Sequence, residues 1–415
     1  MAQTAVTYRP LTQAEVDVIC ARHDRLWRAK PGGARAVFAF ADLSGLDLSG
    51  RNLQDADFSG AILSDVNFTK TTLDNANLFG ADMQNARMVE CSLRRADLRG
   101  ACLRGANLTG ADLFEADLRE GSIASLDGDR GFRIHEPLRK SADAQGVNLR
   151  GANLQRSRLS GIMAMRADFT DAVMKDCKLV RANLKQATLR GADLAGADLS
   201  SADLSGADLQ DAILVGAKTS QWTVDHANLK GVLTDETHGT ALASLPYAEM
   251  LAQHALWCET GGAHGKPSCF DGADLRALKS VRTLNLTALS AKGAVFYGLD
   301  MEGVQLQGAH LEDADLRGCN LRRADLRGAR LIGAKLSGAD LRDAHLGPLM
   351  IRQDMLLPAD LSRASFKGSD LTRADLRRAV MKDADFERAI LTGANVRLMD
   401  LVEAHTAGVH GMPRT

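Results

Sequence analysis

Aromatic residues, proline and net charge are all scarce in this chain of 415 residues. Phe, Trp and Tyr together make up 4% of the residues, and only 8 residues are proline. The 51 basic and 52 acidic side chains leave a formal net charge of -1. This balance argues against a strongly basic nucleic-acid binder and against a strongly acidic surface. We therefore do not expect direct binding to nucleic acid.

Long hydrophobic runs are also missing. No stretch reaches the length of about 18 apolar residues that a membrane-spanning helix requires, so we expect no membrane span. The first residues lack the basic and then apolar pattern of a secretory signal. The 7 cysteines are odd in number and scattered, which fits a reducing compartment better than a disulfide framework. These features together predict a cytoplasmic protein.

A five-residue repeat fills most of the chain. Residues 192–211 read ADLAG ADLSS ADLSG ADLQD. Each unit has a small residue, then Asp or Asn, then a large apolar residue that we call the centre, then two polar or glycine residues. The centres run from Leu43 to about Ile123, from Leu149 to about Leu229, and from about Phe296 to Leu401.

The period of five excludes a helix and favours short strands. In a helix, successive centres would be offset by about 140° and would cover no single face. In a strand, the small residue and the centre point inward while the Asp or Asn between them points outward. The last two residues of each unit suit a corner, where glycine permits a positive φ. The pattern therefore predicts a parallel β-helix whose coils pair with one another.

The A-(D/N)-L-x-x unit resembles the pentapeptide-repeat family over residues 41–125, 147–235 and most of 273–405. The resemblance implies an all-β solenoid, a right-handed quadrilateral parallel β-helix with about 20 residues per coil. Phe366 and Phe386 lie one such coil apart and are expected to stack.

Two segments break the repeat with helical patterns that we interpret as short helical caps. Residues 11–30 contain a capping-box pattern at Thr12 and Glu15. In both segments a His is followed by Leu-Trp and then by a Gly-Gly pair, which is Gly32-Gly33 just after 11–30 and Gly261-Gly262 within 245–262, and this suggests a duplicated module. The expected segments are a helical cap at 1–38, β-helix at 39–125, a connecting loop at 126–146, β-helix at 147–235, a second helical cap or insert at 236–270, β-helix at 271–405 and a tail at 406–415.

The break at 126–146 shifts the phase of the centres by one residue. It is either a loop on a continuous β-helix or a hinge between two of them. Its charge and Pro137 favour an exposed loop.

No recognised catalytic or cofactor motif occurs in the sequence. His254, Cys258, His264 and Cys269 cluster, but their spacing is not that of a zinc site. A helix packed through a buried Cys and a half-exposed His is the favoured alternative to zinc. The sequence therefore predicts no catalytic, cofactor or metal site. Three cysteines fall at the small inward position, where we interpret them as replacing alanine: Cys91, Cys177 and Cys319.

The Asp and Asn of the repeat are expected to form outward columns. If every coil has four units, Asp300, Asn320, Asp340 and Asp360 form one column, and residues two positions later alternate in charge. This favours a neutralised, solvated surface in which individual pairs are weak. The dense arginines of the last module could instead contact phosphate or an acidic partner: Arg317, Arg322, Arg323, Arg327, Arg330, Arg373, Arg377 and Arg378.

The leading functional hypothesis is a non-catalytic scaffold for protein–protein interaction. Exposed aromatic residues are typical interface anchors, and arginine is also enriched at interfaces. The candidate contact residues are Phe79, Phe114, Trp222, Tyr247, Trp257, Arg322 and Arg342.

The resemblance implies an alternative function, mimicry of duplex DNA toward a type II topoisomerase such as DNA gyrase. That role is associated with strongly negative faces, and this sequence departs from it through its balanced charge. An enzyme is not expected, although a deep pocket at 215–272 with several His or Cys side chains would reopen that possibility.

Overall fold

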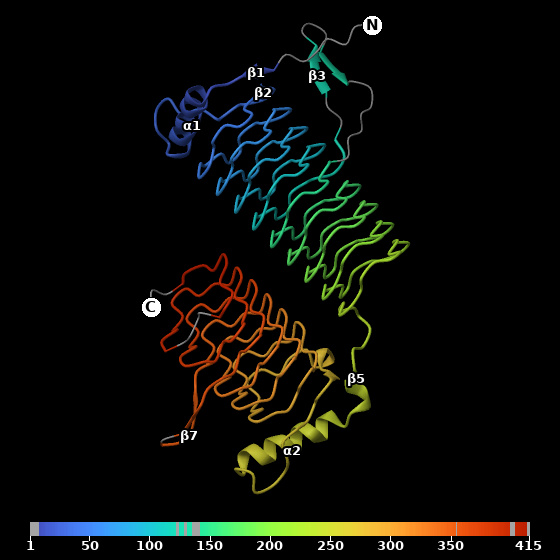
Figure 1. Cartoon of the computed structure of the whole chain (residues 1–415), viewed down its shortest axis with the longest axis vertical. Coiled ribbons are helices and arrows are strands. Elements are labelled where there is room, and N and C mark those ends of the chain that lie inside the picture. Colours follow the sequence, from blue (N-terminus) through green and yellow to red (C-terminus); the bar gives the residue numbers. More distant parts are fainter. Residues whose placement is uncertain are drawn as a thin grey trace. The chain divides into compact units, whose positions relative to one another are not determined.

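The computed structural model describes residues 8–121, 124–127, 131–134, 142–353, 355–398 and 403–412. The chain divides into two compact units, Met1–Asp235 and Glu236–Thr415. They run from blue to green and from yellow to red in Figure 1, and each has a hydrophobic core of its own. The expected centres Ile123 and Leu401, and Pro137 of the expected loop, lie outside the described residues.

Each five-residue repeat forms one short side of a coil. The carboxylate of Asp42 accepts a hydrogen bond from the backbone N–H of Ser44 at 2.9 Å, which fixes the bend after the centre. The last residue of a side adopts a left-handed conformation whether or not it is glycine, with φ +65° at Gly50 and +60° at Asp55. The outward Asp or Asn therefore has a structural task, because it stabilises the corner.

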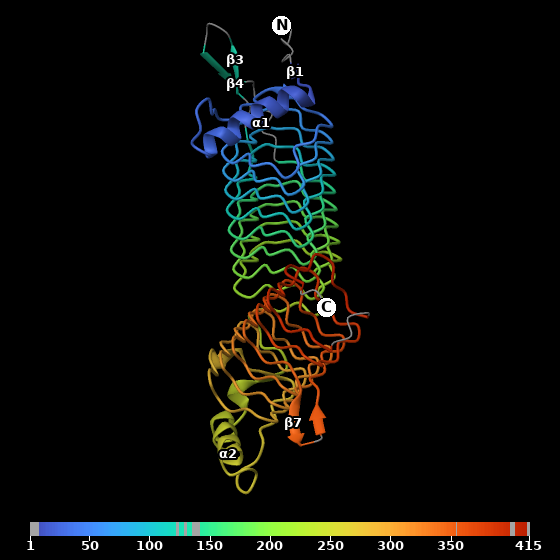
Figure 2. The ribbon, with the colours of Figure 1, turned by 90° about the vertical axis from the view of Figure 1, so that its left-hand side faces the viewer.

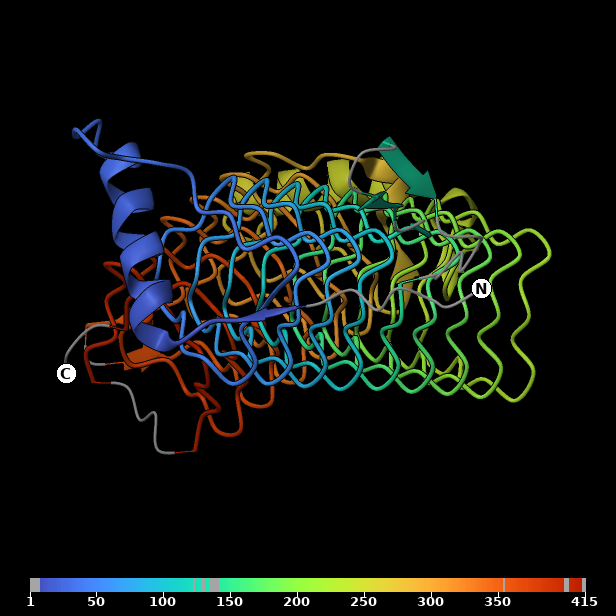
Figure 3. The same cartoon turned by 90° about the horizontal axis from the view of Figure 1, so that it is seen from above.

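Four sides make one coil, so equivalent residues of successive coils lie twenty positions apart, as Asp47 and Asn67 do. Backbone bonds join each side to the sides before and after it in the stack, as Leu43 N–H donates to Ile62 O and Ile62 N–H to Ala41 O, both at 2.9 Å. Figure 3 shows successive coils of the first unit following one another in the stack. The parallel bridges of one coil are Asp42↔Ile62, Asp47↔Asn67, Asn52↔Thr72 and Asp57↔Asn77.

The core consists of centres and small residues stacked along the inside of the coils. Leu194 and Ala197 are both fully buried, as are nearly all their counterparts. Phe366 and Phe386 stack with ring centroids 4.8 Å apart and planes 2° from parallel, so the predicted stacking is confirmed. The thiols at the small inward position are buried too, and burial raises the pKa of Cys319 to about 12.

The break in the first unit is a loop on a continuous stack. The bridge Cys102↔Asp143 joins residues that lie forty-one positions apart instead of twenty, so the coil holds twenty-one additional residues. Leu103 N–H donates directly to Asp143 O at 2.7 Å, so the coils on the two sides of the break are bonded to each other. The insertion contains an antiparallel pair, β3 (Ala124–Asp127) and β4 (Gly131–Ile134).

Helix α1 (Gln13–Trp27) begins at the predicted capping box, in which Thr12 and Glu15 bond reciprocally. Strand β1 (Arg9–Pro10) leads into it and pairs in parallel with β2 (Ala41–Asp42) of the first coil. Val16 and Cys20 of α1 are buried and belong to the same core as the coils. Figure 2 shows α1 lying across the end of the first unit's stack.

The second unit begins in the same way. Strand β5 (Thr240–Ala241) pairs in parallel with β6 (Ala273–Asp274), and between them lie the 3-10 turn η1 (Leu242–Ser244) and helix α2 (Tyr247–Glu259). A second 3-10 turn, η2 (Arg276–Leu278), follows β6. The expectation of a buried Cys and a half-exposed His was wrong, because His254 is fully buried and Cys258 is only half-buried.

Candidate partner-binding site

An insertion that the repeat pattern did not predict interrupts the coils of the second unit. The bridge Asp325↔His345 joins positions separated by twenty, whereas His345↔Asp375 joins positions separated by thirty, so ten residues are added to this coil. They include an antiparallel hairpin of β7 (Leu349–Arg352) and β8 (Met355–Leu357).

The same insertion corrects the predicted column of acidic residues. Asp340 is bridged to Asp370 and not to Asp360, which is bridged to Arg330 on another side. Because each side takes five residues, the ten additional residues shift every later repeat by two sides around the coil.

The base of the hairpin packs closely on the preceding coil. Leu349 and Leu357 lie opposite each other in the hairpin and both contact Gly328. A Cβ at Gly328 would lie 2.8 Å from Leu349 Cβ and 3.1 Å from Leu357 Cδ2, and the φ of Gly328 is +66°. The close approach leaves no room for a Cβ, so glycine is required here.

Beyond its base the hairpin exposes apolar side chains to solvent. Met350 is 65% exposed, and its partner across the hairpin is Leu356. Exposed apolar side chains gathered on one short element are typical of an interaction site. The exposed apolar residues of the hairpin are Met350, Ile351, Met355, Leu356 and Leu357.

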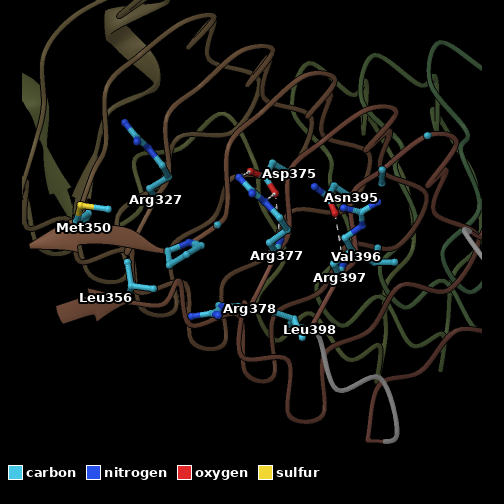
Figure 4. A pocket seen from close by; sticks show the side chains of 14 residues that line it. Arg327, Met350, Leu356, Asp375, Arg377, Arg378, Asn395, Val396, Arg397 and Leu398 are labelled. Atoms are coloured by element: carbon cyan, nitrogen blue, oxygen red, sulfur yellow. Dashed lines mark hydrogen bonds and ion pairs between the residues drawn. The ribbon is translucent and has the colours of Figure 1, made fainter. Parts of the chain in front are cut away.

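A row of residues on one side of the coils faces the hairpin region. Bridges connect Asp325, His345, Asp375 and Asn395 in order, so the residues two positions after each of them also follow one another. Figure 4 shows the three arginines of this row, with Arg327 nearest to the hairpin. The row, which we call the arginine row, consists of Arg327, Gly347, Arg377 and Arg397.

The hairpin and the arginine row enclose a groove of about 1330 Å³. Met350 and Leu356 form one wall, and Arg378 and Leu398 lie on the far side (Figure 4). Gly347 is buried and contributes no side chain to the row, and a Cβ there would lie 3.5 Å from Asp375 Oδ2. The remaining lining residues are Pro348, Asp375, Gly393, Ala394, Asn395 and Val396.

Two of the arginines in the row are neutralised by carboxylates on the same side of the coil. Arg377 donates from Nε and Nη2 to the two oxygens of Asp375 at 2.8 and 2.7 Å. Burial alone would raise the pKa of Asp375, but the hydrogen bonds from Arg377 outweigh it and lower the pKa. Arg327 is held by Asp325 in the same way.

The third arginine of the row has no such partner. Its side reads Asn395-Val396-Arg397, so a neutral amide stands where the other two sides have an aspartate. The backbone N–H of Arg378 donates to the backbone O of Arg397 at 3.2 Å, so the two residues lie side by side on neighbouring coils. Both side chains are exposed, and neither forms an ion pair within the described part of the chain. The groove therefore carries excess positive charge.

The predicted contact residues Phe79 and Phe114 lie half-buried on different sides of the first unit. Asn77 belongs to one column of bridged residues and Asp112 belongs to another, so the two rings do not form one patch. The Arg99 guanidinium covers Phe79 at 5.3 Å, and the Arg94 guanidinium covers Phe114 at 4.7 Å. These cation–π contacts leave less of either ring for a partner.

The predicted aromatic residues at the central break lie in separate units. Trp222 occupies a small inward position in the last coil of the first unit, where it is half-buried against the core. Tyr247 and Trp257 lie on α2 in the second unit, and Tyr247 is the more exposed of the two.

Arg322 and Arg342 follow each other on one side of the second unit, because Asn320 is bridged to Asp340. Arg342 is held by Asp340 in a two-pronged ion pair. Arg322 stands two positions after Asn320, and its buried Nε has no hydrogen-bond partner among the described residues. The structure does not bring either arginine into the groove.

Sequence reasoning missed the hairpin although the signal was present. Residues 347–358, GPLMIRQDMLLP, contain no A-(D/N)-L unit and hold two apolar runs between two prolines. Two short apolar runs separated by a brief polar turn are typical of a hairpin.

The described residues offer little for other kinds of site. Within these ranges, no group of three or more His, Cys, Asp or Glu side chains could hold a metal ion. In the same part of the chain, no helix is both long and apolar enough to cross a bilayer.

Several solved structures resemble the chain with low TM-scores, which support no argument about function. Rfr23, a pentapeptide-repeat protein from the cyanobacterium Cyanothece 51142, is 28% identical, with 31% of this chain and 88% of that chain covered and a TM-score of 0.22. HetL from Nostoc sp. strain PCC 7120, described as involved in heterocyst differentiation regulation, is 20% identical, with 93% and 95% covered and a TM-score of 0.18. QnrB1, described as a plasmid-mediated fluoroquinolone resistance protein, is 14% identical, with 65% and 92% covered and a TM-score of 0.20. A comparison with curated proteins finds no match.

Two family models match the sequence itself. The model described as "Pentapeptide repeats" matches residues 140–171, 177–216, 309–347 and 359–397, and the model described as "Pentapeptide repeat region" matches residues 38–127. The gap between 347 and 359 coincides with the hairpin β7–β8. Together the matches cover more than half of the chain, which therefore belongs to the pentapeptide-repeat family.

Proposed function

We propose that the protein is a non-catalytic scaffold that binds another protein in the groove of its second unit. The observation that carries this proposal is the exposed apolar hairpin beside the arginine row. Met350 and Leu356 lie opposite each other on one wall of the groove and are 65% and 41% exposed. Burying such side chains against a partner removes apolar surface from water and stabilises the complex.

In this proposal α1 and α2 cap the first coils of their units. Support comes from Val16 and Cys20 of α1, which are buried in the core of the first unit. Met250 and Leu251 of α2 likewise pack against the core of the second unit. A cap of this kind covers the edge that the first coil would otherwise present to other chains.

The charge pattern does not favour mimicry of DNA toward a type II topoisomerase. A continuous negative face would be needed, but Asp97 and Asp117 each bind the arginine two positions later. In the next two coils the equivalent positions on this side are occupied by Arg158 and Lys178 in place of aspartate. The acidic residues of this side are thus interrupted and neutralised.

Site-specific photo-cross-linking tests the scaffold proposal. A photoreactive amino acid at Met350 is expected to cross-link one protein in cells that make this chain, whereas the same group at Val380 is not. Val380 is a matched control because it is exposed, apolar and in the same unit but does not line the groove.

The cross-linked protein must then be purified and titrated against the full chain. We expect it to bind the wild type and to bind Met350→Ser/Leu356→Ser at least about tenfold more weakly, which corresponds to about 1.4 kcal/mol. Equal cross-linking at Met350 and Val380, or unchanged binding by the double variant, would contradict the proposal.

A further inference from the structure

We propose that the partner segment bound in this groove is an acidic amphipathic stretch of a protein chain. This inference rests on the proposed function of the groove and specifies the chemistry of its occupant. Three features of the groove support it: the positive charge of Arg378 and Arg397, which form no ion pair with the described residues, the apolar wall and the concave shape.

The charge comes from two exposed arginines on neighbouring coils. A backbone hydrogen bond joins Arg378 to Arg397 at 3.2 Å, and both side chains are exposed. Arg397 lacks the aspartate that neutralises Arg327 and Arg377, because Asn395 occupies that position. A carboxylate of a bound segment can form a charge-assisted hydrogen bond with either guanidinium.

The apolar wall explains why the occupant must be amphipathic. Met350 and Leu356 face the groove from the hairpin, and Leu398 on the far side is 74% exposed. A purely acidic segment would leave these side chains in water. Methionine is flexible and polarisable, so Met350 can adapt to apolar side chains of different shapes.

The concave shape favours a chain segment over a lipid surface. The groove holds about 1330 Å³ between the hairpin and the last coils. A bilayer presents a broad surface and would contact only the rim, whereas an amphipathic segment can lay its apolar face into a groove. Its acidic flank would then meet Arg378 and Arg397.

The test uses the full chain and three fluorescent helical peptides. The first peptide has leucine on one face and glutamate on the other. The second has lysine in place of every glutamate, and the third has serine in place of every leucine. We expect the wild type to bind the first peptide at least about tenfold more tightly than the other two, with binding weakened by salt because the charges are exposed.

Charge reversal gives the sharpest outcome. Arg378→Glu/Arg397→Glu is expected to weaken binding of the glutamate peptide by about tenfold or more and to strengthen binding of the lysine peptide. The control is Arg363→Glu, which changes an exposed arginine of the same unit that does not line the groove. Circular dichroism of every variant establishes that the coils remain folded.

The result can separate this inference from the scaffold proposal. If Met350 cross-links a partner but the wild type prefers the lysine or serine peptide, or none, the acidic amphipathic assignment is wrong and the scaffold stands. If charge reversal leaves both the peptide and the cross-linked partner unaffected, the arginine pair has no binding role. Sedimentation with phosphatidylserine vesicles is expected to be negative; binding that depends on Met350 and Arg378 would overturn the inference in favour of a membrane.

Discussion

Aspartate followed two positions later by arginine is a self-contained unit of this surface. The aspartate accepts the backbone N–H of the arginine and also holds its guanidinium, as Asp97 does with Arg99 and Asp340 with Arg342. One side of a coil thus neutralises its own charge without any contribution from its neighbours. At Asn395 an asparagine replaces the aspartate, and Arg397 forms no ion pair with the described residues.

The contribution of such an ion pair to the free energy of unfolding should depend on its burial. Arg317 binds Asp315, and its side chain is 5% exposed, whereas the side chain of Arg342 is 40% exposed. We expect Arg317→Met to lower the free energy of unfolding by about 3 kcal/mol, because Asp315 would be left buried without its partner. Arg342→Met should cost less than about 1 kcal/mol. Urea unfolding followed by circular dichroism measures both, and equal losses would contradict the dependence on burial.

At the scale of the element, both helices are tied to their coils by a buried histidine. His23 Nδ1 accepts the N–H of Ala36 at 3.0 Å, and His254 Nδ1 accepts the N–H of Ser268 at 2.8 Å. Both rings are fully buried. Trp27 Nε1 lies 3.1 Å from His23 Nε2, whereas His254 Nε2 has no hydrogen-bond partner among the described residues. The ring nitrogen that accepts the backbone bond must be unprotonated, so the attachment requires neutral histidine.

This attachment predicts a loss of stability in acid. Burial lowers the pKa of His23 and of His254 below the ordinary value of 6.5. The unfolded chain therefore takes up a proton at higher pH than the folded one, so the contribution is complete above about pH 6.5 and is lost as the pH falls below it. Around His23, Asp24 and Asp55 raise the pKa and Arg35 lowers it, but burial is the largest effect.

Hydrogen exchange at the two accepting sites measures this effect. We expect the amides of Ala36 and Ser268 to exchange faster at about pH 5 than at about pH 7.5, after correction for the intrinsic rate, while the Leu43 amide is unchanged. His23→Asn keeps an acceptor that does not titrate, so the pH dependence at Ala36 should vanish in that variant. If the variant retains the dependence, His23 is not its source.

The helices and the hairpin differed in how far the sequence could predict them. Thr12 and Glu15 form a local capping signal within four residues, so the start of α1 was predictable. The burial of His254 was not, because it depends on the return of the chain at Ser268, fourteen positions later. The insertion that contains the hairpin β7–β8 adds ten residues, a multiple of five, so the phase of the repeat is the same before and after it. The hairpin is therefore not marked by a phase shift.

At the scale of the whole molecule, the two units have separate hydrophobic cores. Because stability in a repeat protein comes from each coil and its nearest neighbours, a unit with its own first coil is expected to fold alone. We predict that chains ending at Asp235 or beginning at Glu236 each give a cooperative urea transition. The full chain should then show the sum of the two curves, measured by circular dichroism. A unit that stays unfolded by itself would contradict this independence.

The stacking of the coils was predictable apart from the register after the hairpin, and the candidate site was not. Period, inward alanines and the Phe366–Phe386 contact all follow from repetition, because each side meets an equivalent side one coil away. The groove depends on exceptions to that rule: Gly347 without a side chain, Asn395 in place of aspartate, and the hairpin wall. A site built from departures cannot be located until the structure shows which departures meet.

The regular stacking of coils also makes the second unit a molecular ruler. Each coil adds about 4.8 Å along the axis, the spacing of paired strands, and its four sides divide the circumference. Deleting one complete coil, such as 300–319, would bring the hairpin one step closer to α2 while leaving it on the same side. Inserting ten residues into a coil between α2 and the hairpin, with the pairing of each side kept, would instead place the hairpin on the opposite side of the stack. The distance and direction between two attachment points are thus set in discrete increments by the number of repeats.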